Sequence, residues 1–147
     1  MLKVVLVHPQ IPPNTGNIAR TCAATYTPLH LVKPLGFAIS DRYLKRAGLD
    51  YWQYTDLHIH ENLDQFKANA QGRWLCFSAR GQYHFREFAY APDDWLLFGS
   101  ETDGLPPELL KEYPSIFIPM AHPQVRSLNL SVSVAIGLFE AMRQLGI

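Results

Sequence analysis

Short apolar runs, separated by segments of helix or turn character, constrain the fold of this chain most strongly. Most of these runs are continuous rather than alternating, which is typical of strands buried on both faces of a parallel sheet. The predicted strands are Lys3–Val7, Leu29–Val32, Leu57–His60, Trp74–Phe77, Trp95–Phe98 and Ile116–Ile118. Strands that alternate with helices along a chain form a parallel sheet with helices on both faces. The sequence therefore predicts an α/β fold.

The helices between these strands have recognisable start and stop signals. They are predicted from about Thr15, at residues 41–48 (DRYLKRAG, a short basic helix), at Asn62–Ala70, and from Pro106–Pro107 to about Tyr113. Asn14 is the expected N-cap of the first of them, because asparagine favours that position. Prolines are favoured in the first turn of a helix, as at Pro107.

The C-terminal segment predicts a strand, a polar loop and a long helix, in that order. Ala121–Leu128 is polar or small, and Ser127 or Asn129 is suited to cap the helix that follows. The helix carries apolar residues on two lines, which are Leu130, Val134, Leu138 and Met142 on one and Val132, Ile136 and Phe139 on the other. Two apolar lines predict burial on two sides, against the chain's own sheet and against another surface such as a second subunit.

The length and composition indicate one globular domain over residues 1–147, because 48% of the residues are apolar. Lys and Arg number 13 and Asp and Glu also number 13, so any nucleic-acid surface must be a local patch. Cys22 and Cys76 form no CxxC pattern, which favours reduced thiols and a cytoplasmic protein. The first residues, MLKVVLVHP, are too short for a signal peptide or a membrane span.

Common signatures of cofactor and metal sites are missing from the sequence. It contains no GxGxxG, no Walker A motif and no GxSxG, which removes the main evidence for Rossmann, P-loop and α/β-hydrolase functions. His58 and His60 fall on one face of a predicted strand, but an isolated HxH is more often a surface pair than a metal site. No metal cofactor is predicted.

Three polar loops with glycine or proline each lie beside a predicted strand. They read NTGNIAR, which contains Arg20; FGSETDGLP, which contains Glu101; and IPMAHPQVRSLNLS. In a parallel sheet the carboxyl ends of the strands meet at one edge, where open α/β sheets bind ligands. One such loop alone is most simply a turn between a strand and a helix. Together, without a phosphate-binding signature, they favour a ligand other than a nucleoside triphosphate.

These three loops resemble the three motifs of the SPOUT (α/β-knot) methyltransferases. The resemblance is closest to the small TrmL (YibK) group, which methylates the ribose 2′-hydroxyl of the tRNA wobble nucleotide, cytidine or uridine 34. The segments IPPNTGNIAR, PLGF, LKRAGLDY and EAMRQLG also resemble that group, so the similarity covers nearly the whole chain. The resemblance implies a SPOUT fold with a C-terminal trefoil knot, S-adenosylmethionine as methyl donor and an obligate homodimer whose site is built from two subunits.

The same resemblance implies roles for individual residues by motif position. The cofactor-binding residues would be Phe77, Gly99, Glu101, Ile118, Met120, Ser127, Leu128 and Asn129, with Ser127, Asn129 and Ser131 near the methionine end. Arg20 is the implied catalytic arginine, assisted by Asn14 and Ser131. Because arginine stays protonated, Arg20 is expected to orient the phosphate and polarise the hydroxyl rather than to accept its proton.

RNA binding by a chain without net charge requires a local basic surface. Arg42, Lys45 and Arg46 fall on one face of the predicted basic helix, with the aromatic residues Tyr43, Tyr51 and Trp52 nearby. Arg126 is a further RNA-binding candidate, or a contact to the partner subunit. The implied partner is the tRNA anticodon stem-loop, and no membrane is involved.

Asp103 and Val132 depart from the family pattern, and these departures leave two alternatives open. One alternative is the same chemistry on another RNA, such as ribosomal RNA. The other is an RNA-binding relative that has lost most of its catalytic activity.

Overall fold

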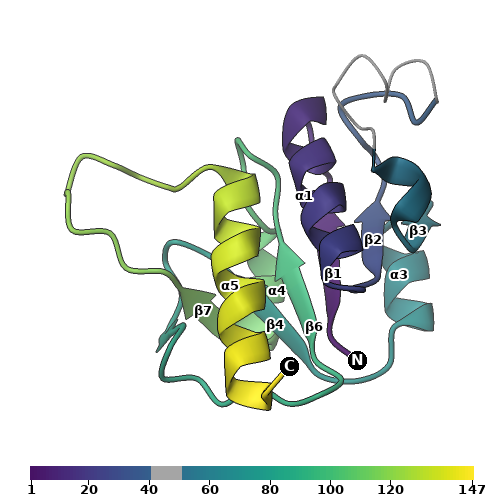
Figure 1. Cartoon of the computed structure of the whole chain (residues 1–147). Helices are drawn as coiled ribbons and strands as arrows, with labels where there is room; N and C mark the ends of the chain where they lie inside the picture. Colours follow the sequence, from purple (N-terminus) through teal and green to yellow (C-terminus); the bar gives the residue numbers. More distant parts are fainter. Residues whose placement is uncertain (41–50) are drawn as a thin grey trace.

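A computed structural model describes residues 1–40 and 51–147. Its described strands form one parallel sheet in the order β3-β2-β1-β6-β4-β7-β5 (Figure 1). The strands are β1 (Lys3–Val7), β2 (Leu29–Val32), β3 (Leu57–His60), β4 (Trp74–Phe77), β5 (Tyr83–His84), β6 (Trp95–Phe98) and β7 (Ser115–Phe117). The α/β class and the parallel sheet are thus confirmed.

The predicted strands agree with the structure, and one strand was missed. The first five predicted ranges coincide with β1, β2, β3, β4 and β6, and β7 begins and ends one residue earlier than predicted. The additional strand β5 contains only Tyr83 and His84, which pair with Ile116 and Phe117 of β7. No apolar run marks this segment, because a two-residue edge strand is specified by the neighbour that it pairs with rather than by its own pattern.

The helices cover both faces of the sheet. They are α1 (Pro12–Ala24), the 3₁₀ turn η1 (Trp52–Tyr54), α3 (Leu63–Asn69), α4 (Pro107–Glu112) and α5 (Leu130–Leu145). Helices α1 and α5 lie side by side on one face, where Ile18 and Leu138 pack with Leu6, Leu96 and other strand residues (Figure 1). On the other face α3 and α4 contribute Phe66 and Leu109 to a second core. The central strands β1, β2, β4 and β6 are therefore buried on both faces, which explains their mainly apolar runs.

The prediction that Asn14 caps the first helix is wrong. Helix α1 begins at Pro12 and its N-cap is Ile11, so Asn14 lies inside the first turn, where it is buried. Prolines at the first helical positions are compatible with this earlier start, because the first amides of a helix lack intrahelical acceptors. The side chain of Asn14 is consequently free to bond with other parts of the chain.

The other cap predictions differ in outcome. Asn62 caps α3 by accepting a hydrogen bond from the backbone N–H of Gln65 at 2.8 Å. Asn129, rather than Ser127, caps α5. The predicted basic helix at residues 41–48 lies outside the described residues.

The two apolar lines of α5 face different surroundings. Val134 and Leu138 are fully buried against the sheet, whereas Val132 and Phe139 are 46% and 52% exposed. Within residues 1–40 and 51–147, Val132 and Phe139 of the second line are therefore left largely uncovered.

Cys22 and Cys76 are free and buried, as the sequence indicated, and burial raises the pKa of each thiol to about 12. Among the described helices, none has both the length and the apolar character needed to cross a bilayer.

The histidines of β3 form a stack with a third histidine that sequence analysis did not connect to them. His30 on β2 stacks on His58 at 4.4 Å and on His60 at 5.2 Å between ring centroids, and its Nδ1 lies 2.9 Å from His60 Nε2. Trp95 and Phe66 contact His30 edge-on. In the described part of the chain, no three His, Cys, Asp or Glu side chains are arranged to hold a metal ion.

This stack should make stability fall in acid. Burial, with the neighbouring His58, His60 and Lys3, lowers the pKa of His30 from 6.5 to about 3. Below pH 6.5 the unfolded chain binds a proton at His30 that the folded chain does not, until the pH reaches about 3. The free energy of unfolding should therefore decrease by about 1.4 kcal/mol per pH unit in this window for this one group.

Denaturant unfolding between pH 7.5 and pH 5 measures this dependence. His30→Leu should flatten it by about one proton equivalent, because leucine does not titrate. An unchanged slope in His30→Leu would show that other groups cause the acid sensitivity.

Candidate functional site

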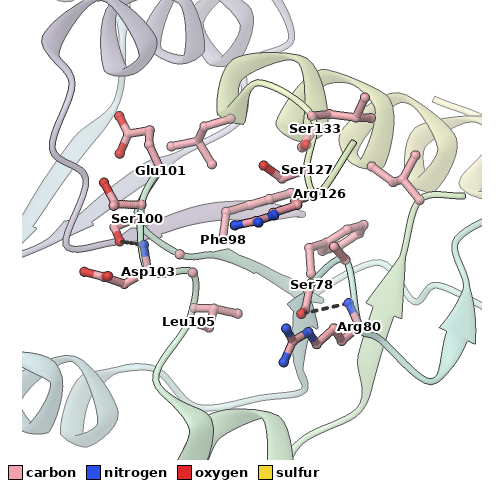
Figure 2. Close-up of a pocket in the computed structure, with 18 of the residues that line it drawn as sticks. Ser78, Arg80, Phe98, Ser100, Glu101, Asp103, Leu105, Arg126, Ser127 and Ser133 are labelled. Carbon is pink, nitrogen blue, oxygen red and sulfur yellow. Dashed lines mark hydrogen bonds between the residues drawn. The ribbon is translucent and has the colours of Figure 1, made fainter. Parts of the chain in front are cut away.

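A cavity of about 720 Å³ opens at the carboxyl ends of the strands. The loops that follow β1, β4, β6 and β7 contribute to its walls, and Figure 2 shows labelled side chains from the last three of these loops around the cavity. The chain order reverses between β1 and β6, which are neighbours in the sheet, and such switch points are where open α/β sheets bind ligands. The predicted convergence of the three polar loops is confirmed.

The carboxylate of Glu101 joins the loop after β6 to the start of α1. It accepts hydrogen bonds from the backbone N–H groups of Gln10 at 2.9 Å and Ile11 at 2.8 Å, and from Asn14 Nδ2 at 3.2 Å. Hydrogen bonds to an ionised acceptor are stronger than neutral ones. Glu101 lines the cavity, but its oxygens are engaged by these donors, so it fixes the position of one wall.

The side chain of Asn14 connects Glu101 to the start of α5 through two hydrogen bonds. While its amide donates to Glu101, its Oδ1 accepts from Asn129 Nδ2 at 3.0 Å. Asn129 Oδ1 in turn accepts from Ser131 N at 2.9 Å and from Ser131 Oγ at 2.6 Å. A chain of side-chain hydrogen bonds thus links all three motif loops through one buried asparagine.

Two substitutions at Asn129 should separate its two contributions. Asn129→Ala removes the α5 cap and the bond to Asn14, and should lower the free energy of unfolding by about 2 kcal/mol. Asn129→Asp keeps the cap acceptor but loses the amide donor, so about 1 kcal/mol of loss is expected. Urea unfolding measures both variants. If the aspartate variant is as stable as the native chain, the link to Asn14 contributes nothing.

The apolar floor of the cavity is closely packed. Phe77 and Phe98 stack at 4.6 Å between ring centroids, and Gly137 of α5 packs directly against Phe77. At Gly99, an added Cβ would lie 2.0 Å from the carbonyl carbon of Gly104 and 2.1 Å from the nitrogen of Leu105. Only glycine fits there, because the loop after β6 folds tightly back on itself.

Most of the predicted site residues lie on this cavity. Its walls include every predicted cofactor-binding residue (Phe77, Gly99, Glu101, Ile118, Met120, Ser127, Leu128 and Asn129) together with Asn14 and Arg126. Ser131 does not line the cavity but is hydrogen-bonded to Asn129, which does. The predicted RNA-binding residues Arg42, Lys45 and Arg46 lie outside the described residues.

Arg20 is separate from the cavity. It is exposed on α1, and its guanidinium carbon lies 4.6 Å from the centroid of the Tyr51 ring, next to η1. A guanidinium over an aromatic face is a favourable cation–π contact. A single chain therefore does not bring Arg20 to the cavity wall.

The sequence interpretation missed the fourth wall, which is the loop after β4. Ser78, Ala79 and Arg80 line the cavity, and so does Ser133 on α5. The position of β4 in the sequence provided a signal, because a loop that follows a parallel strand reaches the same edge as the other loops. The segment was overlooked because it contains none of the family motifs.

Comparison with solved structures places this arrangement in the SPOUT class of methyltransferases. A structure described as "Structural insights into the 2-OH methylation of C/U34 on tRNA" superimposes with a TM-score of 0.94 at 49% identity, covering 99% of this chain and 97% of the other. An AdoMet-bound rRNA methyltransferase from Sinorhizobium meliloti superimposes with a TM-score of 0.84 at 29% identity. The alignment covers 98% of this chain and 56% of the Sinorhizobium chain.

Sequence comparisons define the family. The model of the SpoU rRNA Methylase family matches residues 1–139, and the chain belongs to this family. A putative tRNA (cytidine(34)-2′-O)-methyltransferase of Synechocystis sp. is 58% identical over 99% of this chain and 97% of its own length. A tRNA (cytidine(34)-2′-O)-methyltransferase of Burkholderia ambifaria is 47% identical over the same shares. The sequence resemblance is thereby confirmed.

Proposed function

We propose that this protein is an S-adenosylmethionine-dependent methyltransferase that modifies the ribose 2′-hydroxyl of the wobble nucleotide, cytidine or uridine 34, in the anticodon loop of tRNA. The observation that carries the proposal is the cavity at the switch point, whose walls include residues of all three motif loops. Relatives similar over nearly the full chain bear the name of this activity.

The cavity fits the cofactor in size and in chemistry. Its volume of about 720 Å³ lies within the range of small-molecule sites. Gly99, where the chain folds closely, lies on the cavity wall and adds no side chain, and Phe77, Ile118 and Leu128 supply apolar surface. S-adenosylmethionine would supply an activated methyl group on a sulfonium centre. Met120, Ser127 and Asn129 would hold the remaining parts, with Ser127 and Asn129 at the methionine end.

Transfer requires an in-line approach of the ribose oxygen and loss of the hydroxyl proton. Because arginine side chains stay protonated in proteins, Arg20 would orient the phosphate and polarise the hydroxyl, while another group or water accepts the proton. Asn14 and Ser131 position the substrate from the hydrogen-bonded chain that also contains Asn129. Glu101 keeps the loop after β6 in place.

The position of Arg20 supports a homodimer. Because Arg20 does not line its own chain's cavity, an arginine from a second subunit would complete the site. The half-exposed Val132 and Phe139 on α5 offer an apolar surface for that subunit. Residues 1–147 would form one SPOUT domain, whose C-terminal segment is threaded as a trefoil knot.

The remaining proposals concern the RNA and its compartment. Arg42, Lys45 and Arg46 would contact the anticodon stem-loop, with Tyr51 and Trp52 nearby, and Arg126 would contact RNA from the cavity. Two buried free thiols suit a reducing, cytoplasmic environment.

Methyl transfer from labelled S-adenosylmethionine to bulk tRNA that lacks this modification tests the function. Nuclease mapping should place the label in a dinucleotide with a 2′-O-methylated wobble residue. Label on ribosomal RNA but not on tRNA would refute the proposed substrate. Binding of cofactor and RNA without any transfer would refute the activity and leave an RNA-binding role.

A further inference from the structure

Arg80, in the loop after β4, brings a positive charge to the cavity. Its side chain is exposed and lines the cavity, and among the described residues its guanidinium has no hydrogen-bond or ion-pair partner. Figure 2 shows Arg80 beside Ser78, whose Oγ accepts a hydrogen bond from the backbone N–H of Arg80 at 3.2 Å. An unpaired guanidinium at a cavity wall has its full set of donors available for an anionic ligand.

The backbone that carries Arg80 is fixed against β7. Ser78 N donates to the carbonyl of Ile116 at 2.9 Å, and Gln82 N donates to that of Ser115 at 3.0 Å. Gly81 lies so close to β7 that an added Cβ would be 2.5 Å from the carbonyl carbon of Ile116. The guanidinium therefore projects from a pre-positioned base, which reduces the entropy cost of binding.

The charged side chains that line the cavity allow an anion to bind near Arg80. Among the described residues, two acidic side chains line the cavity, Glu101 and Asp103. The carboxylate of Glu101 accepts hydrogen bonds from three donors, whereas that of Asp103 has no described side-chain donor. Arg126 adds a second guanidinium without a described partner. The cavity walls thus offer two available positive charges.

The neighbouring edge of the sheet favours RNA as the source of the anion. Three residues beyond Arg80, Tyr83 is 49% exposed on β5, the last strand of the sheet. Single-stranded RNA is held by cations that contact its phosphates and by aromatic rings that stack on its bases. The carboxylate of the cofactor is the alternative anion, although under the proposed function Ser127 and Asn129 would hold the methionine end.

We propose that Arg80 binds a phosphate of the RNA strand adjacent to the nucleotide that enters the cavity. The forked guanidinium suits a phosphate group, and its location at the cavity would hold the strand while the target ribose is presented. This inference rests on the proposed function, because it assumes an RNA substrate. It adds a substrate-binding residue in the loop after β4, which contains none of the three sequence motifs.

The test compares Arg80→Ala with Lys67→Ala, which removes one charge from α3, a helix that does not line the cavity. Arg80→Ala should raise the Kd and the KM for tRNA about tenfold, with a smaller change in kcat. The salt dependence of tRNA binding should become shallower by about one phosphate contact. Arg80→Lys should recover part of the affinity, and S-adenosylmethionine should bind all variants equally.

Several outcomes would overturn this inference. Equal tRNA affinity in Arg80→Ala and Lys67→Ala, measured where the native protein methylates tRNA, would exclude a phosphate contact by Arg80. Weakened S-adenosylmethionine binding with unchanged tRNA binding would assign Arg80 to the carboxylate of the cofactor instead. If the native protein neither binds nor methylates tRNA, the proposed function itself fails, and this result is visible before any variant is compared.

Discussion

Arg20→Ala is expected to reduce methyl transfer about 10²- to 10³-fold while leaving the affinity for S-adenosylmethionine unchanged. The reason is positional: Arg20 is exposed on α1 and does not line the cavity of its own chain, so it should not contribute to cofactor binding there. Its proposed role is to polarise the ribose hydroxyl and orient the phosphate, which affects the transition state.

Single-turnover kinetics at saturating cofactor, together with calorimetric titration of S-adenosylmethionine, measure the two quantities separately. Asn17→Ala, at an exposed position of the same helix, is the matched control for helix surface changes. Arg20→Lys keeps the charge but loses the fork, and should recover only part of the rate. Near-native turnover in Arg20→Ala would remove Arg20 from the mechanism, whereas a parallel loss of cofactor affinity would indicate a structural role.

Gly99→Ala is expected to have the largest effect on the cavity itself. An added Cβ would overlap the backbone of Gly104 and Leu105, and backbone atoms cannot move aside as the end of a flexible side chain can. We expect a loss of about 3 kcal/mol in the free energy of unfolding and a loss of measurable cofactor binding, because the loop after β6 must open.

Gly104→Ala in the same loop is the matched control. Gly104 has a φ of +69° but open space around it, so alanine there should cost only about 1 kcal/mol of backbone strain. Thermal unfolding and cofactor titration of both variants measure the difference. A Gly99→Ala protein that is no less stable than Gly104→Ala would show that the close approach at Gly99 does not hold the loop.

The sequence by itself determined the class of fold and the edge on which the cavity lies. Runs such as Lys3–Val7 and Trp95–Phe98 are continuous because both faces of those strands are buried, and this pattern is local enough to be read from a few residues. The loops that follow parallel strands must then reach one edge. Individual roles for Arg20 and the cofactor-binding set came from resemblance to known motifs, and remain proposals.

The tertiary structure decided which side chains meet. Asn14 was expected to cap its own helix, but its partners Glu101 and Asn129 lie 87 and 115 residues away along the chain. The strand β5 and the wall containing Arg80 likewise depend on pairing with β7, a segment remote from both. Local patterns report short-range preferences, whereas a polar side chain that can bond in several ways is assigned its partner only when distant segments are packed together.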